Sequence, residues 1–115
     1  LWSMRDKKRY WLYGRVASPD KWALENQMNY LRSFAEKYQL NVVGESQDEA
    51  SGLTLDRPGL NDFLEAVRQG QADTLLTKDL TRLGRDTMQT ATWIAQLNTS
   101  GVGVFSVTDL IFWGL

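Results

Sequence analysis

The chain has 115 residues, a length typical of one domain, and 43% of them are hydrophobic, which is enough to form a buried core. Its formal net charge of −1 provides no overall basic field for nucleic acid, although a local cluster of cations remains compatible with DNA binding. The sequence contains no cysteine and no histidine, which excludes disulfides, zinc–thiolate sites and catalysis by Ser-His-Asp or Cys-His groups. An enzyme built from it must use hydroxyl, amino, guanidinium and carboxylate groups.

Two features of the sequence lead us to expect a cytoplasmic protein. The apolar runs are far shorter than the roughly 20 residues of a membrane-spanning helix, so we expect no membrane partner. The first residues are basic but lack the apolar segment and cleavage site of a signal peptide. We expect residues 1–8 to form a loose leader before the first strand.

The first half of the chain predicts a strand, a helix, a strand and a loop. Residues 9–17 predict a strand because they are rich in aromatic and β-branched side chains. Residues 19–39 predict an amphipathic helix because apolar side chains recur at helical spacing. Trp22 can pack in its core or cover a site at the strand ends, and we expect the core. Residues 40–46 predict a second strand, and the polar, aperiodic residues 48–57 predict a loop.

The second half repeats the alternation of helix and strand. Pro58 suits the first position of a helix that Gly70 ends. After it the sequence predicts a third strand at residues 72–79, a turn at 80–86, a third helix from Met88 to near Gly101, and a fourth strand at 101–107.

Strands that alternate with helices predict βαβ units and therefore an α/β fold with right-handed crossovers. We expect a three-layer domain whose mainly parallel sheet has four to five strands and is covered by helices on both faces. In such sheets ligands bind at the carboxyl ends of the strands, which makes those ends the place to search for a site.

Four arginines follow the ends of three predicted strands. They are Arg15, Arg57, Arg82 and Arg85. Their planar, permanently charged groups suit bidentate binding of phosphate, and four of them at one point would repel each other without an anion between them. Arg57 also precedes a predicted helix, whose free N–H groups would add to an anion site.

Other polar residues stand at the same strand ends. Asp48 and Ser51 follow the second strand, and Lys78 follows the third. Structural roles without a ligand remain open for these charged residues and for the four arginines. Every arginine can be an ordinary surface residue, Asp48 and Asp79 can serve only to pair with arginines, and Lys78 can be a solvated strand end.

Five segments in this order resemble the catalytic domain of serine site-specific recombinases, the resolvase/invertase family. They are "YGRVAS", "ALENQ", "DEASGLTLDRPGL", "DTLLTKDLTRLGRDT" and "GVGVFSVTD", and they extend from residue 13 to residue 109. The most specific parts are "SG…DRPGL" and "TRLGRD" in combination. The resemblance implies a resolvase-like catalytic domain over residues 1–115.

The resemblance also implies a reaction and a set of site residues. In this family a serine attacks a DNA phosphodiester, forms a 5′-phosphoserine link and frees a 3′-hydroxyl. The strands then exchange and rejoin without metal, ATP or another cofactor. The family's arginines fall on the four named above, and its supporting residues fall on Gln27, Asp48, Ser51 and Gly52.

The nucleophile is where the sequence departs from the family. The family's Arg-Val-Ser becomes Arg15-Val16-Ala17, and Ser18 follows. Strand alternation from Arg15 assigns the nucleophile's place to Ala17, whereas counting back from Gln27 favours Ser18. Ser18 before Pro19 is also a typical helix cap, so both roles for this serine stay open.

Two further departures concern the branch of the family and the end of the chain. Thr81 stands where small resolvases have aspartate, which favours the large transposon- and phage-borne branch. Family members continue into a dimerisation helix and a DNA-binding domain that we expect to be absent after "VTDLIFWGL". The resemblance therefore implies DNA, and a homodimer or tetramer, as partners of the full-length protein.

Two other functions remain open. A catalytically inactive recombinase-like module, with Ala17 at the nucleophile's position, would act in assembly or occlude DNA sites. A phosphoanion-binding domain of the response-regulator type is disfavoured because no acidic cluster follows the first strand.

Overall fold

The computed structural model describes residues 7–114, so most of the expected leader lies outside the described residues. A single five-stranded sheet has the strand order β2-β1-β3-β4-β5. Its strands are β1 (Arg9–Val16), β2 (Asn41–Glu49), β3 (Thr74–Thr77), β4 (Gly103–Ser106) and β5 (Ile111–Trp113). The helices are α1 (Lys21–Lys37), α2 (Pro58–Arg68) and α3 (Thr87–Thr99), with a short 3-10 helix at Leu80–Arg82.

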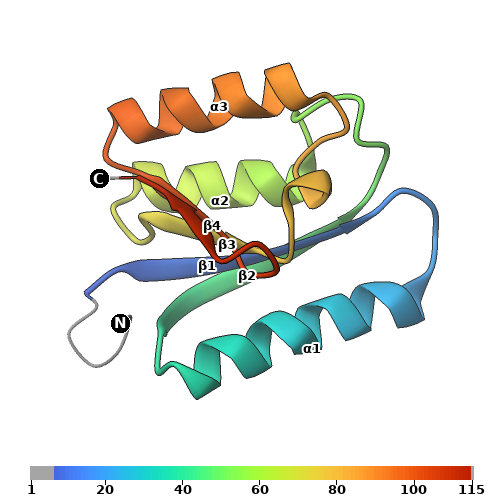
Figure 1. Cartoon of the computed structure of the whole chain (residues 1–115), viewed down its shortest axis with the longest axis horizontal. Coiled ribbons are helices and arrows are strands. Elements are labelled where there is room, and N and C mark those ends of the chain that lie inside the picture. Colours follow the sequence, from blue (N-terminus) through green and yellow to red (C-terminus); the bar gives the residue numbers. More distant parts are fainter. Residues whose placement is uncertain (1–6, 115) are drawn as a thin grey trace.

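The predicted α/β fold with three layers is confirmed. The first four strands pair in parallel, and only β5 pairs antiparallel to its neighbour β4. Figure 1 shows α1 on one face of the sheet and α2 with α3 on the other. The carboxyl ends of β1 and β3 therefore lie at one edge, as the strand–helix alternation predicts.

Several element bounds differ from the prediction. Helix α1 begins at Lys21 and not at Pro19, because Asp20 accepts a hydrogen bond from the Ala23 N–H and caps the helix. Strand β2 extends to Glu49, so Asp48 belongs to a strand and not to the predicted loop. The predicted turn at residues 80–86 contains the 3-10 helix, whose cap is Asp79.

The face of the sheet under α1 is closed by one compact apolar cluster. Leu12 of β1 and Leu76 of β3 pack there against Met28 and Leu31 of α1. Gly14 lies beneath the helix, and a Cβ atom at this position would come within 2.7 Å of the Met28 Sδ atom. Glycine at residue 14 therefore permits the close approach of α1 to β1.

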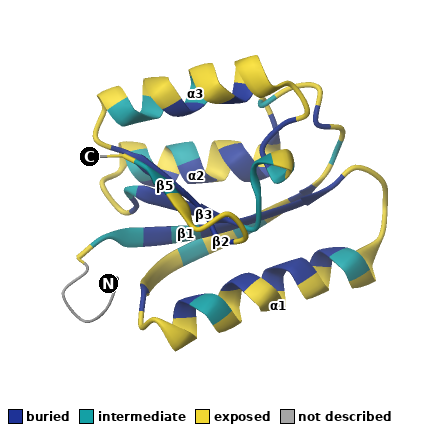
Figure 2. Cartoon of the chain, in the orientation of Figure 1, coloured by how far each residue is buried: buried dark blue, intermediate teal, exposed yellow. Residues whose placement is uncertain are grey.

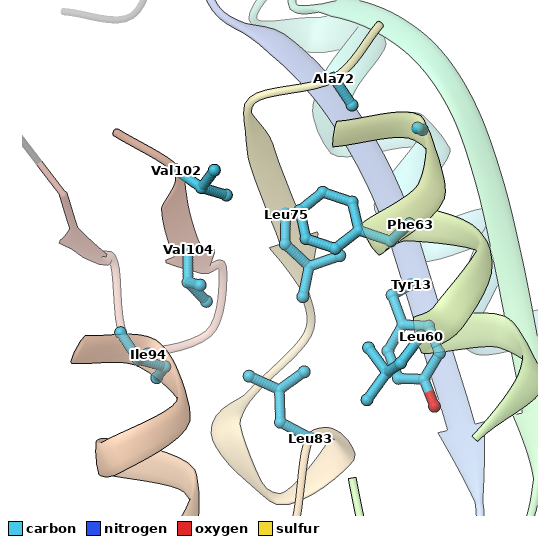
Figure 3. Packing of buried hydrophobic residues seen from close by; sticks show 10 residues of the cluster. Tyr13, Leu60, Phe63, Ala72, Leu75, Leu83, Ile94, Val102 and Val104 are labelled. Carbon is cyan, nitrogen blue, oxygen red and sulfur yellow. The ribbon is translucent and has the colours of Figure 1, made fainter. Parts of the chain in front are cut away.

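The opposite face holds a second apolar cluster between the sheet and helices α2 and α3. Figure 3 shows Leu60 and Phe63 of α2 over Leu75 of β3, with Ile94 of α3 and Leu83 completing the layer. Tyr13 of β1 lies in the same cluster, and its hydroxyl lies at the end away from Ala72. This hydroxyl is the point where the core meets the polar strand ends.

Trp22 lies elsewhere than predicted, and the apolar end of the chain forms a further strand. Trp22, which we expected in the helix core, is 77% exposed at the start of α1, which Figure 2 shows as a solvent-facing stretch. The apolar end of the chain forms β5, whose Phe112 packs against the cluster beneath α1 and whose Trp113 packs against the other. None of the helices within residues 7–114 is long and apolar enough to span a membrane.

Candidate active site

The end of β1 is held by the side chain of Gln27 from α1. The Gln27 Oε1 atom accepts a hydrogen bond from the Arg15 N–H at 2.8 Å, and its Nε2 atom donates to the Arg15 carbonyl at 3.1 Å. The amide is buried and both of its ends are used. Gln27 therefore fixes the backbone at the residue that carries the first arginine of the site.

The Arg15 guanidinium lies on the α2/α3 face and is 5% exposed. Three of its N–H groups donate to backbone carbonyls, namely those of Arg82 at 2.9 Å, Ala50 at 2.9 Å and Thr81 at 2.6 Å. A guanidinium has five N–H donors, so two remain for another acceptor. Arg15 thus joins the loop after β2 to the 3-10 helix and keeps donors for a ligand.

Arg57 is the most deeply buried of the four arginines, with 1% of its surface exposed. Its Nε atom donates to the Thr54 carbonyl at 2.8 Å, and its Nη1 atom donates to the Tyr13 hydroxyl at 2.9 Å and to the Arg82 carbonyl at 3.2 Å. Its Nη2 atom donates to the Leu83 carbonyl. Most of its donors therefore hold the surrounding backbone.

Arg82 and Arg85 are more accessible than the first two arginines. The Arg82 side chain is 29% exposed, makes a loose ion pair with Asp79 at 3.8 Å, and donates a long hydrogen bond of 3.4 Å to the Arg15 carbonyl. Its Nε atom is buried and has no hydrogen-bond partner among the described residues. Arg85 is exposed, so both side chains are open to an incoming anion.

The four arginines come together in space as the strand ends predict. Burial lowers the pKa of Arg15, and the positive charges of Arg57, Arg82 and Arg85 lower it further. Gly52 lies between two of them, because a Cβ atom there would come within 3.0 Å of Arg15 Nη2 and 2.6 Å of Arg85 Cγ. Four converging cations with unused donors form a site that an oxyanion would stabilise.

The sequence left open that Asp48 pairs with an arginine, but no such pair is present within residues 7–114. Its carboxylate accepts hydrogen bonds from the Tyr13 hydroxyl at 2.7 Å and from the Gly59 N–H at 2.9 Å. The N-terminus of α2 is therefore capped by Asp48 from β2. The expectation that its N–H groups would join an anion site is wrong for Gly59, whose N–H is already used.

The Tyr13 phenol connects Asp48 to Arg57. Burial raises the pKa of Tyr13, and its hydrogen bond to the Asp48 carboxylate raises it further, so the phenol stays protonated and donates to Asp48. The same oxygen accepts a hydrogen bond from Arg57. Tyr13, which the sequence argument did not single out, thus aligns two predicted site residues.

Replacing Tyr13 by phenylalanine should lower the free energy of unfolding by about 1–3 kcal/mol, because the buried Asp48 and Arg57 each lose a partner. Urea unfolding of both proteins measures this difference. Tyr38→Phe is the matched control, since Tyr38 is exposed on the surface and should tolerate loss of its hydroxyl. Equal stability of Tyr13→Phe and the unmodified chain would contradict a structural role for the phenol.

Ser18 lies in a bend between β1 and α1. Strand β1 ends at Val16, so the alternation that assigns the nucleophile's place to Ala17 does not extend to either residue. Ser18 is not the helix cap, since Asp20 occupies that position. Both Ala17 and Ser18 are exposed, and no hydrogen bond within residues 7–114 joins Ser18 to the four arginines.

Of the remaining predicted residues, Asp79 pairs with Arg82, which was the alternative open for it, whereas Ser51 and Lys78 have no hydrogen bond to the four arginines within residues 7–114. The Ser51 hydroxyl is exposed and accepts a hydrogen bond from the Leu53 N–H at 3.2 Å. The Lys78 ammonium lies 5.5 Å from the centre of the Tyr30 ring, on the α1 face of the sheet. Asp79 accepts a hydrogen bond from the Thr81 N–H at 3.0 Å and stabilises the 3-10 helix.

The family model described as "Resolvase, N terminal domain" matches residues 10–112, nearly the whole chain. The chain belongs to the resolvase family. The transposon Tn3 resolvase of Escherichia coli is 40% identical over 97 residues, which is 84% of this chain and 49% of that protein. Serine recombinase PinR of Escherichia coli (strain K12) is 30% identical over 96 residues, which is 84% of this chain and 47% of that protein.

Solved structures of serine recombinases share the fold of this resolvase-family domain. The C-terminal catalytic domain of ISC1926 TnpA, an IS607-like serine recombinase, is 34% identical with a TM-score of 0.77, covering 86% of this chain and 70% of that one. A resolvase family site-specific recombinase from Streptococcus pneumoniae is 26% identical with a TM-score of 0.78, covering 92% and 76%. The chain spans between a third and a half of the length of its curated relatives.

Proposed function

We propose that this resolvase-family domain cleaves and rejoins DNA, with Ser18 as the nucleophile and Arg15, Arg57, Arg82 and Arg85 around the phosphate. The observation that carries the proposal is the convergence of the four arginines at the carboxyl end of β1. Arg82 donates to the Arg15 carbonyl, Arg57 donates to the Arg82 carbonyl, and Gly52 lies against the side chains of both Arg15 and Arg85. The full-length protein would bind DNA from a mobile genetic element and act as a homodimer or tetramer.

The proposed step is a transesterification that conserves the number of phosphate ester bonds. The Ser18 Oγ atom loses its proton and bonds to phosphorus, and the bond from phosphorus to the DNA 3′-oxygen breaks. The 3′-oxygen takes up a proton and leaves as a hydroxyl. Religation is the reverse step, in which a 3′-hydroxyl attacks the phosphoserine, and neither direction consumes a nucleotide cofactor.

The arginines divide the work by their accessibility. Arg82 and Arg85 have the exposure needed to contact a phosphate directly and to stabilise the charge on pentavalent phosphorus. Arg15 keeps two unused donors at the same place. Arg57 mainly holds the backbone that carries Arg82. Ser18 would reach this group through movement of the bend at residues 17–20.

A second candidate is the inactive module that assembles with partners or occludes DNA sites. Ala17 at the family's nucleophile position favours it, as do the backbone carbonyls that occupy three donors of Arg15. This candidate and the enzyme share the fold and the arginine cluster. They differ only in whether Ser18 forms a covalent bond with DNA.

The test is a chimera in which residues 10–112 of this chain replace the matching part of the transposon Tn3 resolvase, which supplies the remaining half of a longer protein. The chimera is incubated with that resolvase's own site carrying a nick, which traps the cleaved intermediate. We expect a covalent protein–5′-DNA adduct, with the phosphate mapped to Ser18 by mass spectrometry. Ser18→Ala should abolish the adduct without weakening DNA binding.

Ala17→Ser provides the matched control, because it restores the family's spacing between arginine and serine. An adduct formed only by the Ala17→Ser variant would establish that the natural chain has lost its nucleophile, which is the inactive module. A folded, DNA-binding chimera that forms no adduct in either version would contradict catalysis by this domain altogether.

A further inference from the structure

A pocket lies next to the arginine cluster, on the α1 face of the sheet. It has a volume of about 360 Å³ and is lined by Trp22, Asn26 and Tyr30 of α1 together with Lys78 and Arg82. Sites for small organic ligands commonly have volumes of about 300–1,000 Å³. Ser18 belongs to the bend that joins two lining residues, Val16 and Trp22, so the pocket flanks the proposed nucleophile.

The walls contributed by α1 expose two aromatic rings. Trp22 is 77% exposed and Tyr30 is 44% exposed. Other residues of α1, among them Leu24, Met28 and Leu31, form its buried face. The cluster beneath α1 does not include either ring. An exposed indole keeps a free π-face, which is the surface on which an unpaired nucleobase stacks.

The walls contributed by the loop after β3 are cationic. Lys78 has its ammonium 5.5 Å from the Tyr30 ring centre, and Arg82 has a buried Nε atom with no hydrogen-bond partner among residues 7–114. None of the pocket-lining residues within residues 7–114 is aspartate or glutamate, and the carboxylate of Asp79 lies 3.8 Å from Arg82 Nε. The pocket therefore combines an aromatic platform with donors for an anion, which is the chemistry that binds a nucleotide.

Arg82 is the wall that joins this pocket to the arginine cluster. Its guanidinium lines the pocket, donates to the Arg15 carbonyl on β1, and contributes a charge that lowers the pKa of Arg15. A DNA strand whose phosphate lies among the arginines would therefore place a neighbouring nucleotide at the pocket. The pocket is on the far side of Arg82, toward Trp22 and Tyr30.

We infer that this pocket holds one unpaired nucleotide next to the phosphate of the proposed reaction, with its base stacked on Trp22 and its phosphate near Lys78 and Arg82. The inference rests on the proposed function, because it takes DNA as the ligand of the arginine cluster. Trp22 is then a DNA-contacting residue and not a core residue, and it binds the strand without reading its sequence, since every base has a π-face.

The test measures binding of the full chain to two short fluorescein-labelled strands by fluorescence anisotropy. One strand is oligothymidylate, and the other has the same number of phosphates but abasic sugars. The unmodified chain should bind the strand with bases more tightly. Trp22→Ala should weaken that binding by roughly 5- to 150-fold, the range for loss of one stacked base, and should leave the abasic strand unaffected.

Three further variants make the result specific. Trp22→Phe keeps an aromatic platform and should retain most of the affinity, while Met88→Ala removes an equally exposed apolar side chain from α3 and should change nothing. Lys78→Ala should weaken both strands alike, because it removes a phosphate contact. Equal binding of both strands by the unmodified chain, or equal losses on both strands in Trp22→Ala, would overturn the inference.

The outcome can be separated from that of the proposed function. Ser18→Ala should bind both strands as the unmodified chain does, because binding precedes the covalent step. If Trp22→Ala weakens binding but the chimera forms no covalent adduct, the nucleotide pocket is supported and only the proposed catalysis is contradicted. If the chimera forms the adduct but Trp22→Ala does not weaken binding, the proposed catalysis is supported and only the nucleotide pocket is contradicted.

Discussion

Replacing Arg57 by alanine should lower the free energy of unfolding by about 3–5 kcal/mol, the largest stability effect that we expect from a single polar residue here. The side chain is 1% exposed and bonds to carbonyls of three residues, Thr54, Arg82 and Leu83. Alanine would leave those carbonyls and the Tyr13 hydroxyl without their donor, inside a cavity of the size of the lost side chain. Urea unfolding followed by circular dichroism measures the loss.

Two variants control this measurement. Arg68→Ala removes an arginine whose side chain is 73% exposed and pairs, within residues 7–114, with Glu65 on the same helix, so its effect should be within about 0.5 kcal/mol. Arg57→Lys keeps the charge but should restore little stability, because one ammonium group cannot replace a planar fork of five donors. A loss below about 1 kcal/mol in Arg57→Ala would show that the hydrogen bonds of this arginine are dispensable.

Replacing Arg82 by alanine should reduce the rate of adduct formation in the chimera by roughly 100- to 1,000-fold, as for other groups that stabilise transition-state charge. Stability should change far less than in Arg57→Ala. The side chain is 29% exposed, and its contacts with Asp79 and the Arg15 carbonyl are long, at 3.8 and 3.4 Å. Single-turnover cleavage of the nicked site, measured beside urea unfolding, separates the two effects.

Arg32→Ala is the matched control for Arg82. Arg32 is an exposed arginine on α1 that pairs with Glu45 of β2. No hydrogen bond within residues 7–114 joins it to the four arginines, so its removal should leave cleavage unchanged. Cleavage by Arg82→Ala within a few-fold of the unmodified chimera would contradict a direct role of this guanidinium at phosphorus. A parallel loss in Arg32→Ala would show that the assay follows net charge and not the site.

Much of the fold could be predicted because it depends on neighbours in the chain. Period and turn residues predict three helices and four strands, and the helical crossovers between the strands predict that they pair in parallel. The first and last residues of some elements, such as α1 and β2, differ from the prediction. Of the two roles left open for Ser18, that of helix cap belongs to Asp20, two residues later. Both side chains are suitable caps, and the sequence alone does not choose between them.

The part of the site that could not be predicted depends on partners far away in the sequence. Asp48 caps α2 and binds Tyr13 instead of an arginine, and nothing near Asp48 in the chain indicates either contact. Trp22 is exposed and not in the core, because the helical period places it on the side of α1 opposite the buried Leu24 and Met28, which the spacing in the sequence already indicates. The expected sheet of four to five strands allows for β5, but its position could not be predicted because three apolar residues after a turn have no period to detect.

The sequence by itself determined the α/β fold, its family and the gathering of four arginines at one edge, because parallel strands separated by helices bring their carboxyl ends together whatever the side chains do. Only the tertiary structure decided what each arginine does there. Burial and the distribution of backbone carbonyls commit Arg57 to the scaffold, leave Arg82 open, and place Trp22 beside it. These outcomes depend on which polar groups lose water on folding, and that is a property of the packed molecule.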